Sequence, residues 1–366
     1  MADQKKYNVG IVGATGMVGQ RLVLLLEKHP WFNLTVLAAS SRSAGKTYAQ
    51  AVAGRWFMPT PIPDAVKEAP VLNGQKDIAA IADRADFIFS AVEMEKQALR
   101  DLEEAYAKAE CPVLSNNSAH RWTADVPMII PELNPDHAEI IPAQRRRLGS
   151  TRGFIAVKSN CSLQSYLPPL WPLHVRYGMT KALACTYQAI SGAGKTFSSW
   201  PEMADNVIPL IKGEEEKSEQ EPLKIWGAIT PQGIIPATGP SITSQCIRVP
   251  VSDGHLAAVF ASFEEKPAIE DIKAIWAGFG GLPQQLDLPS APKRFLHYFE
   301  EEDRPQTALD RDLEGGMAVS IGRLRPDSQY DIKFVCLSHN TLRGAAGGNV
   351  LMAELLCSRG YIGHKS

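Results

Sequence analysis

The N-terminal residues place a glycine-rich loop between a short apolar strand and a helix. The predicted strand covers residues 7–12, the loop runs from Gly13 to Gly19 with the spacing G-x-x-G-x-x-G, and the helix follows over residues 20–28. Glycines at such a junction let the backbone approach a pyrophosphate, whose charge then lies at the helix N-terminus. The spacing alone is less specific than G-x-G-x-x-G. Its position predicts the first half of a Rossmann dinucleotide-binding unit.

Strands and helices continue to alternate up to residue 158. Apolar strands are predicted over residues 34–39, 86–91, 111–117 and 155–157, with a helix over 95–109 and a proline-rich, irregular insertion over 47–72. Such alternation predicts a parallel sheet, and the carboxyl ends of parallel strands line the ligand crevice. We therefore predict an α/β fold whose Rossmann-type dinucleotide-binding domain covers residues 1–158.

The residues that end these strands indicate which dinucleotide is bound. The second strand is followed by Ser40, Ser41, Arg42 and Ser43, without an acidic residue. An enzyme that prefers NAD usually has Asp or Glu here for the ribose 2′-hydroxyl, whereas Arg among hydroxyls suits a 2′-phosphate. The pattern favours NADP. Ser90 and Asn116 end later strands and are expected to face the cofactor.

The segment Ser159-Asn160-Cys161-Ser162 follows the last of these strands. We predict a helix start there, with Ser159 or Asn160 as the N-cap and Cys161 in the first turn. Unpaired backbone N–H groups and the helix dipole would stabilise a thiolate, the reactive form of cysteine. A free cysteine that only packs is the alternative. The glycine loop upstream and Arg248 and His255 downstream favour a nucleophile.

After Cys161 the strands become longer and their pattern changes. Apolar strands are predicted over residues 181–189, 246–251, 256–263, 318–324 and 330–337. They predict an α+β catalytic and dimerisation domain over residues 159–340, with a mixed, mostly antiparallel sheet. A helix of small residues begins near Asn340, and we expect residues 341–366 to return to the first domain.

Composition excludes several functions. A net charge of −2 gives no electrostatic reason to expect nucleic acid or an anionic membrane as a partner. Six scattered cysteines without C-x-x-C spacing predict neither a disulfide framework nor a metal site. No segment has the length of a signal peptide's apolar region or of a membrane span. We expect a soluble, cytoplasmic protein that acts on a small molecule.

Several of these motifs occur together in one known family. The motifs are the glycine loop from Gly13 to Gly19 and residues 159–162, 188–194, 248–255 and 340–349. In this order, over nearly the whole chain, they resemble aspartate-β-semialdehyde dehydrogenase. The Glu-rich residues 213–217 and the C-terminal segment are most similar to the archaeal and fungal branch.

The resemblance implies a role for each matching residue. Cys161 would be the nucleophile, His255 the general acid/base, and Gln188 would orient the acyl intermediate. Arg248 would bind the substrate α-carboxylate, Glu214 its α-ammonium, and Arg121, Lys217 and Asn160 the phosphate. The family's cofactor contacts map onto Gly13, Thr15, Gly16, Met17, Val18, Ser40, Ser43, Ser90, Gly192 and Asn340. Glu214 is chosen on a Glu-x-x-Lys spacing, and Glu215 and Glu216 remain alternatives.

The implied activity is the reversible, NADP-dependent reductive dephosphorylation of 4-phospho-L-aspartate to L-aspartate 4-semialdehyde. It would pass through a Cys161 thioester and serve lysine, methionine and threonine biosynthesis, in a homodimer or homotetramer. N-acetyl-γ-glutamyl-phosphate reductase shares this chemistry, but its acylated substrate needs no partner such as Glu214. Malonyl-CoA reductase resembles the same branch. A catalytically silent dinucleotide-binding regulator is disfavoured, because it would not need Cys161, His255, Gln188 and Arg248 together.

Overall fold

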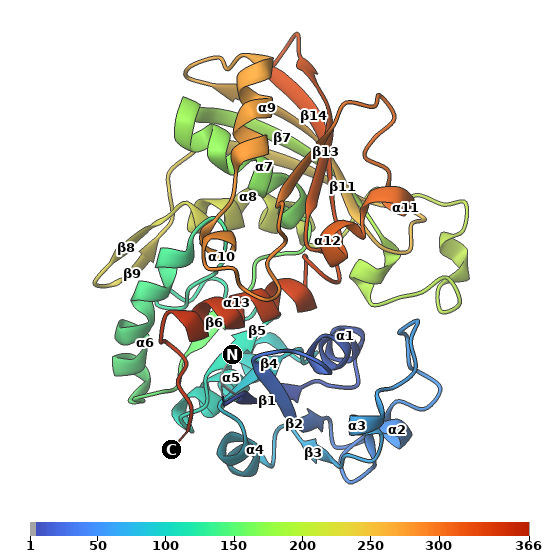
Figure 1. Cartoon of the computed structure of the whole chain (residues 1–366), viewed down its shortest axis with the longest axis vertical. Coiled ribbons are helices and arrows are strands. Elements are labelled where there is room, and N and C mark those ends of the chain that lie inside the picture. Colours follow the sequence, from blue (N-terminus) through green and yellow to red (C-terminus); the bar gives the residue numbers. More distant parts are fainter. Residues whose placement is uncertain (1–4, 366) are drawn as a thin grey trace.

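The computed structural model describes residues 5–365 and contains two six-stranded sheets. The first sheet is parallel, with strand order β3-β2-β1-β4-β5-β6, and lies in the lower half of Figure 1. The second has the order β10-β7-β11-β14-β13-β12 and lies in the upper half. The predicted fold class, a Rossmann-type sheet beside a mixed sheet with helices, is confirmed.

The first sheet is built from short strands separated by helices. In chain order the elements are β1 Tyr7–Val12, α1 Met17–Leu26, β2 Phe32–Ala39, α2 Tyr48–Ala51, α3 Asp64–Lys67, β3 Val71–Asn73, α4 Ile78–Arg84, β4 Phe87–Ser90, α5 Lys96–Lys108, β5 Val113–Ser115, the 3₁₀ helix Pro135–Ile140, α6 Ile141–Leu148 and β6 Ile155–Val157. Strands β4, β5 and β6 are buried on both sides, as expected for a parallel sheet covered by helices. Helix α1 begins three residues earlier than predicted, because Gly16 is its N-cap.

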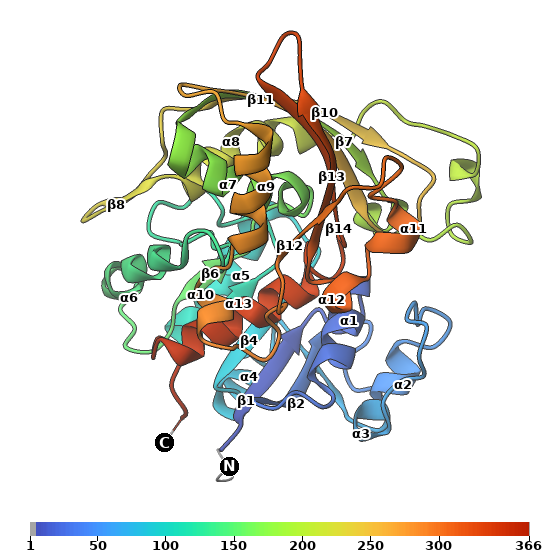
Figure 2. The same ribbon diagram turned by 45° about the horizontal axis from the view of Figure 1, so that its top comes forward.

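The second sheet has helices on one face. Its elements are α7 Leu163–Tyr177, β7 Met179–Gln188, the 3₁₀ helices Ile190–Ala193 and Pro201–Met203, α8 Glu214–Ile225, the hairpin β8 Ala228–Thr230 and β9 Gly233–Ile235, β10 Ser241–Arg248, β11 His255–Phe263, α9 Ile269–Gly278, α10 Leu282–Gln285, β12 Leu296–Phe299, α11 Thr307–Asp310, α12 Leu313–Gly316, β13 Val319–Pro326 and β14 Ile332–Ser338. Figures 1 and 2 show α7 and α9 against the sheet. Three strand pairs are antiparallel and two are parallel, β10 with β7 and β12 with β13.

The other face of this sheet is apolar and only half-buried. Leu183 pairs with Phe260 and Tyr187 with Leu256 across β7 and β11, so all four side chains lie on one face. Alternate residues such as Ala184 are fully buried under the helices, whereas these four are partly exposed. An apolar sheet face of this kind is typical of a protein interface.

The last helix, α13 Ala346–Ser358, returns to the first sheet. It packs against α1 and β5, and the Asn349 Nδ2 donates a hydrogen bond of 3.1 Å to the Leu114 carbonyl. Nearly all of its residues are buried, which explains why the segment is apolar on every side. The helix begins six residues after the predicted start, since residues 340–345 form turns that carry Asn340 toward the second sheet.

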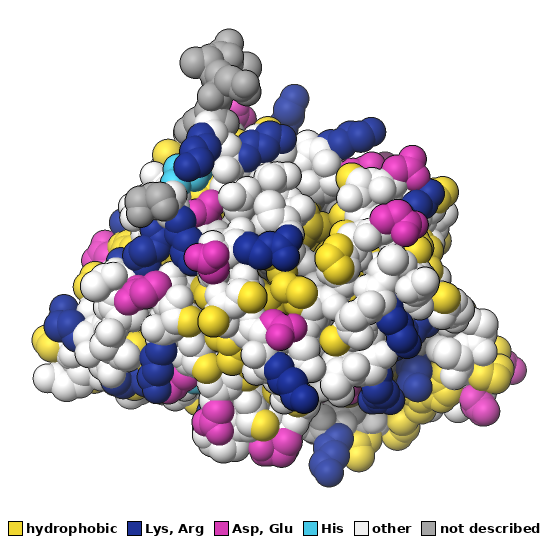
Figure 3. All heavy atoms as spheres, turned by 90° about the horizontal axis from the view of Figure 1, so that it is seen from below, with side chains coloured by type: hydrophobic (Ala, Val, Ile, Leu, Met, Phe, Trp, Pro, Cys, Tyr) yellow, Lys and Arg dark blue, Asp and Glu magenta, His cyan; other side chains and the backbone are white. Residues whose placement is uncertain are grey.

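Between residues 5 and 365, no helix is long and apolar enough to cross a membrane. The same residues contain no group of three His, Cys, Asp or Glu side chains arranged to hold a metal ion. On the face beyond the first sheet, Lys and Arg side chains are interspersed with Asp and Glu (Figure 3).

Candidate active site

Cys161 lies in the connection between the two sheets. Strand β6 ends at Val157 and α7 begins at Leu163, with Ser162 as the N-cap. The prediction that Ser159 or Asn160 caps this helix is therefore wrong, and Cys161 precedes the first turn. The reason is local, because the Asn160 Oδ1 accepts hydrogen bonds from the backbone N–H and the hydroxyl of Ser162, which closes a turn around the cysteine.

The Cys161 sulfur lies 3.4 Å from the His255 Nε2, although the two residues are 94 positions apart. His255 is the first residue of β11 and is fully buried. Its Nδ1 accepts a hydrogen bond of 3.1 Å from the Ala189 N–H. A neutral imidazole has one donor and one acceptor nitrogen, so the proton of His255 lies on Nε2, facing the sulfur.

The electrostatics of this pair differ from the sequence-based expectation. Burial, and then the negative charge of Glu214, raise the pKa of the Cys161 thiol to about 11. Burial, and then the charge of Arg248, lower the pKa of His255 to about 3. In the free protein both groups are neutral at pH 7. The sequence predicts that the helix N-terminus stabilises a Cys161 thiolate. In the structure the cost of burying the charge outweighs that effect, so the thiol stays protonated.

Glu214, at the start of α8, accepts hydrogen bonds from three predicted site residues. The donors are the Asn160 Nδ2 at 2.9 Å, the Lys217 Nζ at 2.8 Å and the Gln188 Nε2 at 3.4 Å. Burial raises the pKa of Glu214, but the charge and hydrogen bond of Lys217 and the hydrogen bond of Asn160 together lower it by more. The pKa of Glu214 is therefore below its usual value. Of the three successive glutamates, Glu215 bonds to Gln245 and Glu216 is exposed. Of these three glutamates, only Glu214 lines the cavity that Cys161 also lines.

Two arginines complete the site. The Arg248 Nη1 donates a hydrogen bond of 2.6 Å to the Ala189 carbonyl. Arg121 is buried, and its Nη1 forms an ion pair of 2.8 Å with Glu221. Gly192 lies against the first arginine, because an added Cβ there would be 2.9 Å from the Arg248 Nη1 and 3.0 Å from the His255 Nε2.

Two adjoining cavities contain most of the predicted residues. The larger, of about 510 Å³, is lined by Gly13, Thr15, Gly16, Met17, Val18, Ser40 and Asn116 among others. The smaller, of about 280 Å³, is lined by Arg121, Asn160, Cys161, Gly192, Glu214, Lys217 and Asn340 among others. Val18, Asn116 and Ser118 line both. The glycine loop and the cysteine therefore share one continuous crevice.

The larger cavity fits a dinucleotide. Gly13 has a φ of +97°, and an added Cβ would lie 2.3 Å from the Ala91 carbonyl oxygen, so the loop accepts only glycine there. Both amide atoms of the Asn116 side chain are buried and have no hydrogen-bond partner among the described residues. A close backbone approach and unpaired polar atoms are what the pyrophosphate and nicotinamide parts of NADP require.

Four predicted cofactor residues line neither cavity. Ser41 and Arg42 are exposed beyond its edge. Ser43 is buried and its hydroxyl accepts a hydrogen bond from Arg55, while the Ser90 hydroxyl accepts one from Asn117. Both hydroxyls are occupied by protein partners, which sequence position alone did not reveal.

Two charged residues near Cys161 were missed. Glu221 accepts hydrogen bonds from the Arg121 guanidinium and from the Asn160 N–H, at 2.8 and 2.7 Å. Its position seven residues after Glu214 puts both on one helix face, a signal that the charged composition of α8 obscured. Lys158, which directly precedes the Ser-Asn-Cys motif, is fully buried.

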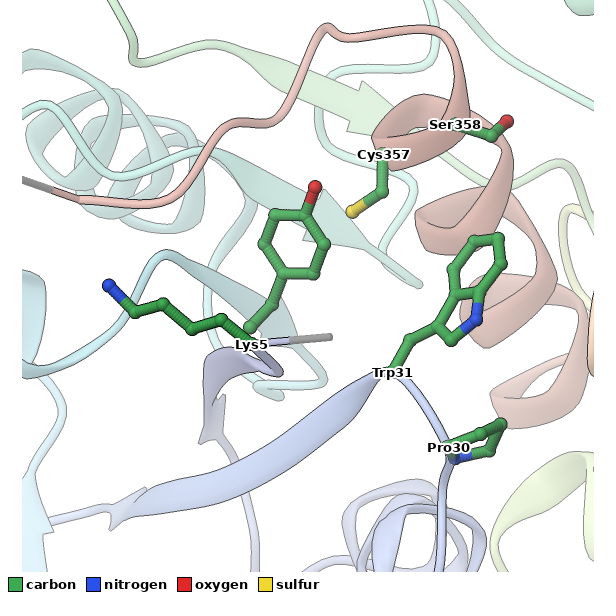
Figure 4. Close-up of a pocket in the computed structure, with 6 residues that line it drawn as sticks. Lys5, Pro30, Trp31, Cys357 and Ser358 are labelled. Carbon is green, nitrogen blue, oxygen red and sulfur yellow. The ribbon is translucent and has the colours of Figure 1, made fainter. Parts of the chain in front are cut away.

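A separate small cavity of about 80 Å³ is shown in Figure 4. It is lined by Lys5, Tyr7, Pro30, Trp31, Cys357 and Ser358. None of these is a predicted site residue, and the cavity shares no lining residue with the crevice.

Comparison with known proteins identifies the family. Residues 8–141 match the model described as semialdehyde dehydrogenase, NAD binding domain, and residues 170–343 match semialdehyde dehydrogenase, dimerisation domain. The aspartate-semialdehyde dehydrogenase of Methanothermobacter thermautotrophicus is 42% identical over 95% of this chain and 98% of its own length. The chain belongs to the aspartate-semialdehyde dehydrogenase family.

Fungal and structural relatives agree with this assignment. The aspartate-semialdehyde dehydrogenase of Cryptococcus neoformans is 39% identical over 99% of this chain and all of its own. A crystal structure of the Candida albicans aspartate-semialdehyde dehydrogenase with NADP matches with a TM-score of 0.88 and 36% identity, covering 98% of this chain and 100% of that one. The predicted resemblance to the archaeal and fungal branch is confirmed.

Replacing Gly192 by alanine tests the geometry of the site. The added methyl group would meet both Arg248 and His255, so we expect Gly192→Ala to lower kcat/KM for aspartate semialdehyde about 10²-fold. Gly278→Ala, at the end of α9, adds a methyl group with no atom within 4 Å and is the control. Steady-state kinetics and thermal unfolding of both variants provide the measurement. Wild-type turnover in Gly192→Ala would contradict the close contact.

Proposed function

We propose that this chain is an NADP-dependent, phosphorylating aspartate-semialdehyde dehydrogenase. It reduces 4-phospho-L-aspartate to L-aspartate 4-semialdehyde and phosphate, reversibly, in the biosynthesis of lysine, methionine and threonine. The contact of 3.4 Å between Cys161 and His255, at a cavity that adjoins the glycine-loop cavity, carries this proposal. Cytoplasmic location is supported by the six cysteines, all of which are free thiols.

The chemistry follows from the thiol and the imidazole. The Cys161 thiolate attacks the acyl phosphate, and phosphate leaves as a thioester forms. NADPH, when held by the glycine loop and Asn116, supplies the hydride that the reduction needs. His255 presents an N–H from Nε2, which donates a hydrogen bond to the substrate oxygen and stabilises the negative charge that develops there as the thioester carbon becomes tetrahedral. Collapse of this tetrahedral species breaks the carbon–sulfur bond and releases the aldehyde and the thiolate.

Substrate recognition is proposed to exchange ion pairs already present. Arg248 binds the α-carboxylate, Glu214 the α-ammonium, and Arg121, Lys217 and Asn160 the phosphate. In the free protein Lys217 and Asn160 are bonded to Glu214. A substrate that carries both an ammonium and a phosphate offers each of these groups a new partner. Because the exchange replaces one ion pair by two, it favours 4-phospho-aspartate over an N-acylated substrate.

The deciding assay follows NADPH formation with purified protein, L-aspartate 4-semialdehyde and NADP⁺, with and without inorganic phosphate. We expect strong turnover that depends on phosphate and is abolished in Cys161→Ala, because the thioester forms on the Cys161 sulfur. Malonyl-CoA and N-acetyl-γ-glutamyl phosphate, each with NADPH, test the reverse reaction. Oxidation of NADPH by either compound, with the semialdehyde inert, would refute the proposed substrate.

His255→Ala separates acid/base catalysis from binding. Since His255 touches the sulfur and is not bonded to a substrate-binding group, we expect kcat to fall about 10²–10⁴-fold while KM changes by much less. Steady-state kinetics in both directions measure the split. A variant with near-normal kcat would remove His255 from the mechanism.

Oligomer formation is proposed to use the open face of the second sheet. The match to a dimerisation domain over residues 170–343 and the apolar residues of β7 and β11 support a homodimer, which can pair further into a homotetramer. No nucleic acid or membrane partner is proposed.

A charge in this face should separate the subunits. Ala258→Asp places a carboxylate between the two apolar pairs of β7 and β11, next to Cys185 on β7 and Val335 on β14, so we expect light scattering to detect a monomer. Val175→Asp, on α7 and 71% exposed, is the matched control and should leave the oligomer intact. An unchanged mass for Ala258→Asp would place the interface elsewhere.

A further inference from the structure

Asn340 lines the same cavity as Cys161, and both polar atoms of its side chain are bonded to the protein. Its Oδ1 accepts a hydrogen bond of 2.8 Å from the Gly254 N–H, and its Nδ2 donates one of 2.8 Å to the Ser191 hydroxyl. A backbone N–H can only donate, so Oδ1 must be the atom that faces Gly254. The resemblance to the family places Asn340 among the cofactor contacts, and this buried bridge between two loops gives it a second role.

One end of the bridge is the residue that precedes His255. Gly254 has a φ of +100°, which lets the chain turn sharply into β11. His255 is the first residue of that strand, and its Nε2 lies 3.4 Å from the Cys161 sulfur. Because the two residues are adjacent in the chain, a shift of Gly254 would move the imidazole with it.

The other end of the bridge is the turn that borders the imidazole. Ser191 lies in the 3₁₀ helix that follows β7, one residue before Gly192. Gly192 is so close to His255 that an added Cβ would lie 3.0 Å from Nε2. Ala189, just before this turn, donates its N–H to the His255 Nδ1 at 3.1 Å. Both ring nitrogens of His255 are thus bordered by the same turn, which the bridge holds at Ser191.

The backbone of Asn340 is anchored independently of its side chain. The next residue, Thr341, accepts a hydrogen bond of 3.3 Å at its hydroxyl from the Arg21 Nη2 on α1. Gly344 packs directly on the Asn340 backbone and leaves no room there for a Cβ. Neither contact involves the Asn340 amide. We therefore expect a substitution of this side chain to release the two loops and to leave the segment after β14 in place.

We propose that Asn340 is a positioning residue that fixes the His255 imidazole beside the Cys161 sulfur by joining the Gly254 turn to the Ser191 turn. In the proposed reaction the His255 Nε2 must face the substrate oxygen as the thioester carbon becomes tetrahedral. A misplacement of about 1 Å at such a step can cost about 10²-fold in rate. This inference rests on the proposed function, and it adds the residue that holds the hydrogen-bond donor in place.

Asn340→Leu tests the bridge, because it removes both hydrogen bonds and keeps a side chain of similar size. We expect kcat for aspartate semialdehyde to fall about 10- to 10²-fold, since the imidazole loses its fixed position. The Kd of NADPH, from fluorescence titration without substrate, should stay close to the wild-type value. Hydrogen exchange, followed by mass spectrometry, should become faster at the N–H groups of Gly254 and Ala189. Asn33→Leu, exposed on β2, is the matched control and should leave all three measurements unchanged.

Two further variants separate the hydrogen bonds from the bulk of the side chain. Asn340→Asp offers one acceptor to the Gly254 N–H and another to the Ser191 hydroxyl, which can also donate, so exchange at Gly254 should stay slow. Its charge also acts on His255, so exchange is the readout for this variant. Ser191→Ala releases one end only, so residues 188–194 should exchange faster while Gly254 stays protected. If Asn340→Asp exchanges as fast as Asn340→Leu, the hydrogen bonds are not the cause and the proposal fails.

The exchange and NADPH measurements need no substrate, so they are independent of the substrate assignment. A higher Kd of NADPH with kcat and exchange unchanged would make Asn340 a cofactor contact only and overturn the proposal. If Asn340→Leu does not fold, wild-type exchange of residues 188–194 in Ser191→Ala would overturn it. Faster exchange in Asn340→Leu, with no turnover of aspartate semialdehyde by the wild type, would refute only the proposed substrate. Normal wild-type turnover, with kcat and exchange unchanged in Asn340→Leu, would refute only the positioning role.

Discussion

The contact between Cys161 and His255 depends on a fixed junction between two separate sheets. Cys161 follows the edge strand of the parallel sheet, and His255 begins a central strand of the mixed sheet. Helix α7 bridges the two, since it starts beside Cys161 and packs along β11, β13 and β14. Arg343 adds a buried clamp, because its guanidinium binds Glu132 and donates to Gln164 on α7. A fully buried ion pair of this kind favours one arrangement of the parts it joins.

Two glutamates hold most of the predicted phosphate-binding groups of the site in pairs when substrate is absent. Glu214 holds Lys217 and Asn160, and Glu221 holds Arg121. These internal pairs keep a phosphate-binding set ordered inside a cavity of about 280 Å³. Donors that are already ordered do not have to reorient when the phosphate binds. An internal ion pair that must open on binding also discriminates against ligands that lack the matching charges.

Features that depend on local pattern could be predicted from the sequence, and features that depend on packing could not. The glycine loop and the strands follow from residue types and spacing, whereas the roles of Cys161 and Glu214 follow from the resemblance to the family. The helix start at Leu163 and the raised pKa of the thiol follow from neither, because they depend on the Asn160 turn and on burial by distant elements. Ser43 shows the same limit, since its partner Arg55 comes from the irregular insertion.

The tautomer of His255 places a constraint on how the thiolate arises. The Ala189 N–H occupies Nδ1, so the neutral imidazole already carries its proton on Nε2 and cannot accept the thiol proton there. The alternative, an imidazolium beside the thiolate, is opposed by burial and by Arg248, which lower the pKa of His255 to about 3. The charges that favour the thiolate belong to other residues, because Lys158, Arg121 and Arg248 each lower the pKa of the thiol. His255 therefore acts as a hydrogen-bond donor to the substrate oxygen, so that activation of the nucleophile and stabilisation of that oxygen depend on different residues of one buried site.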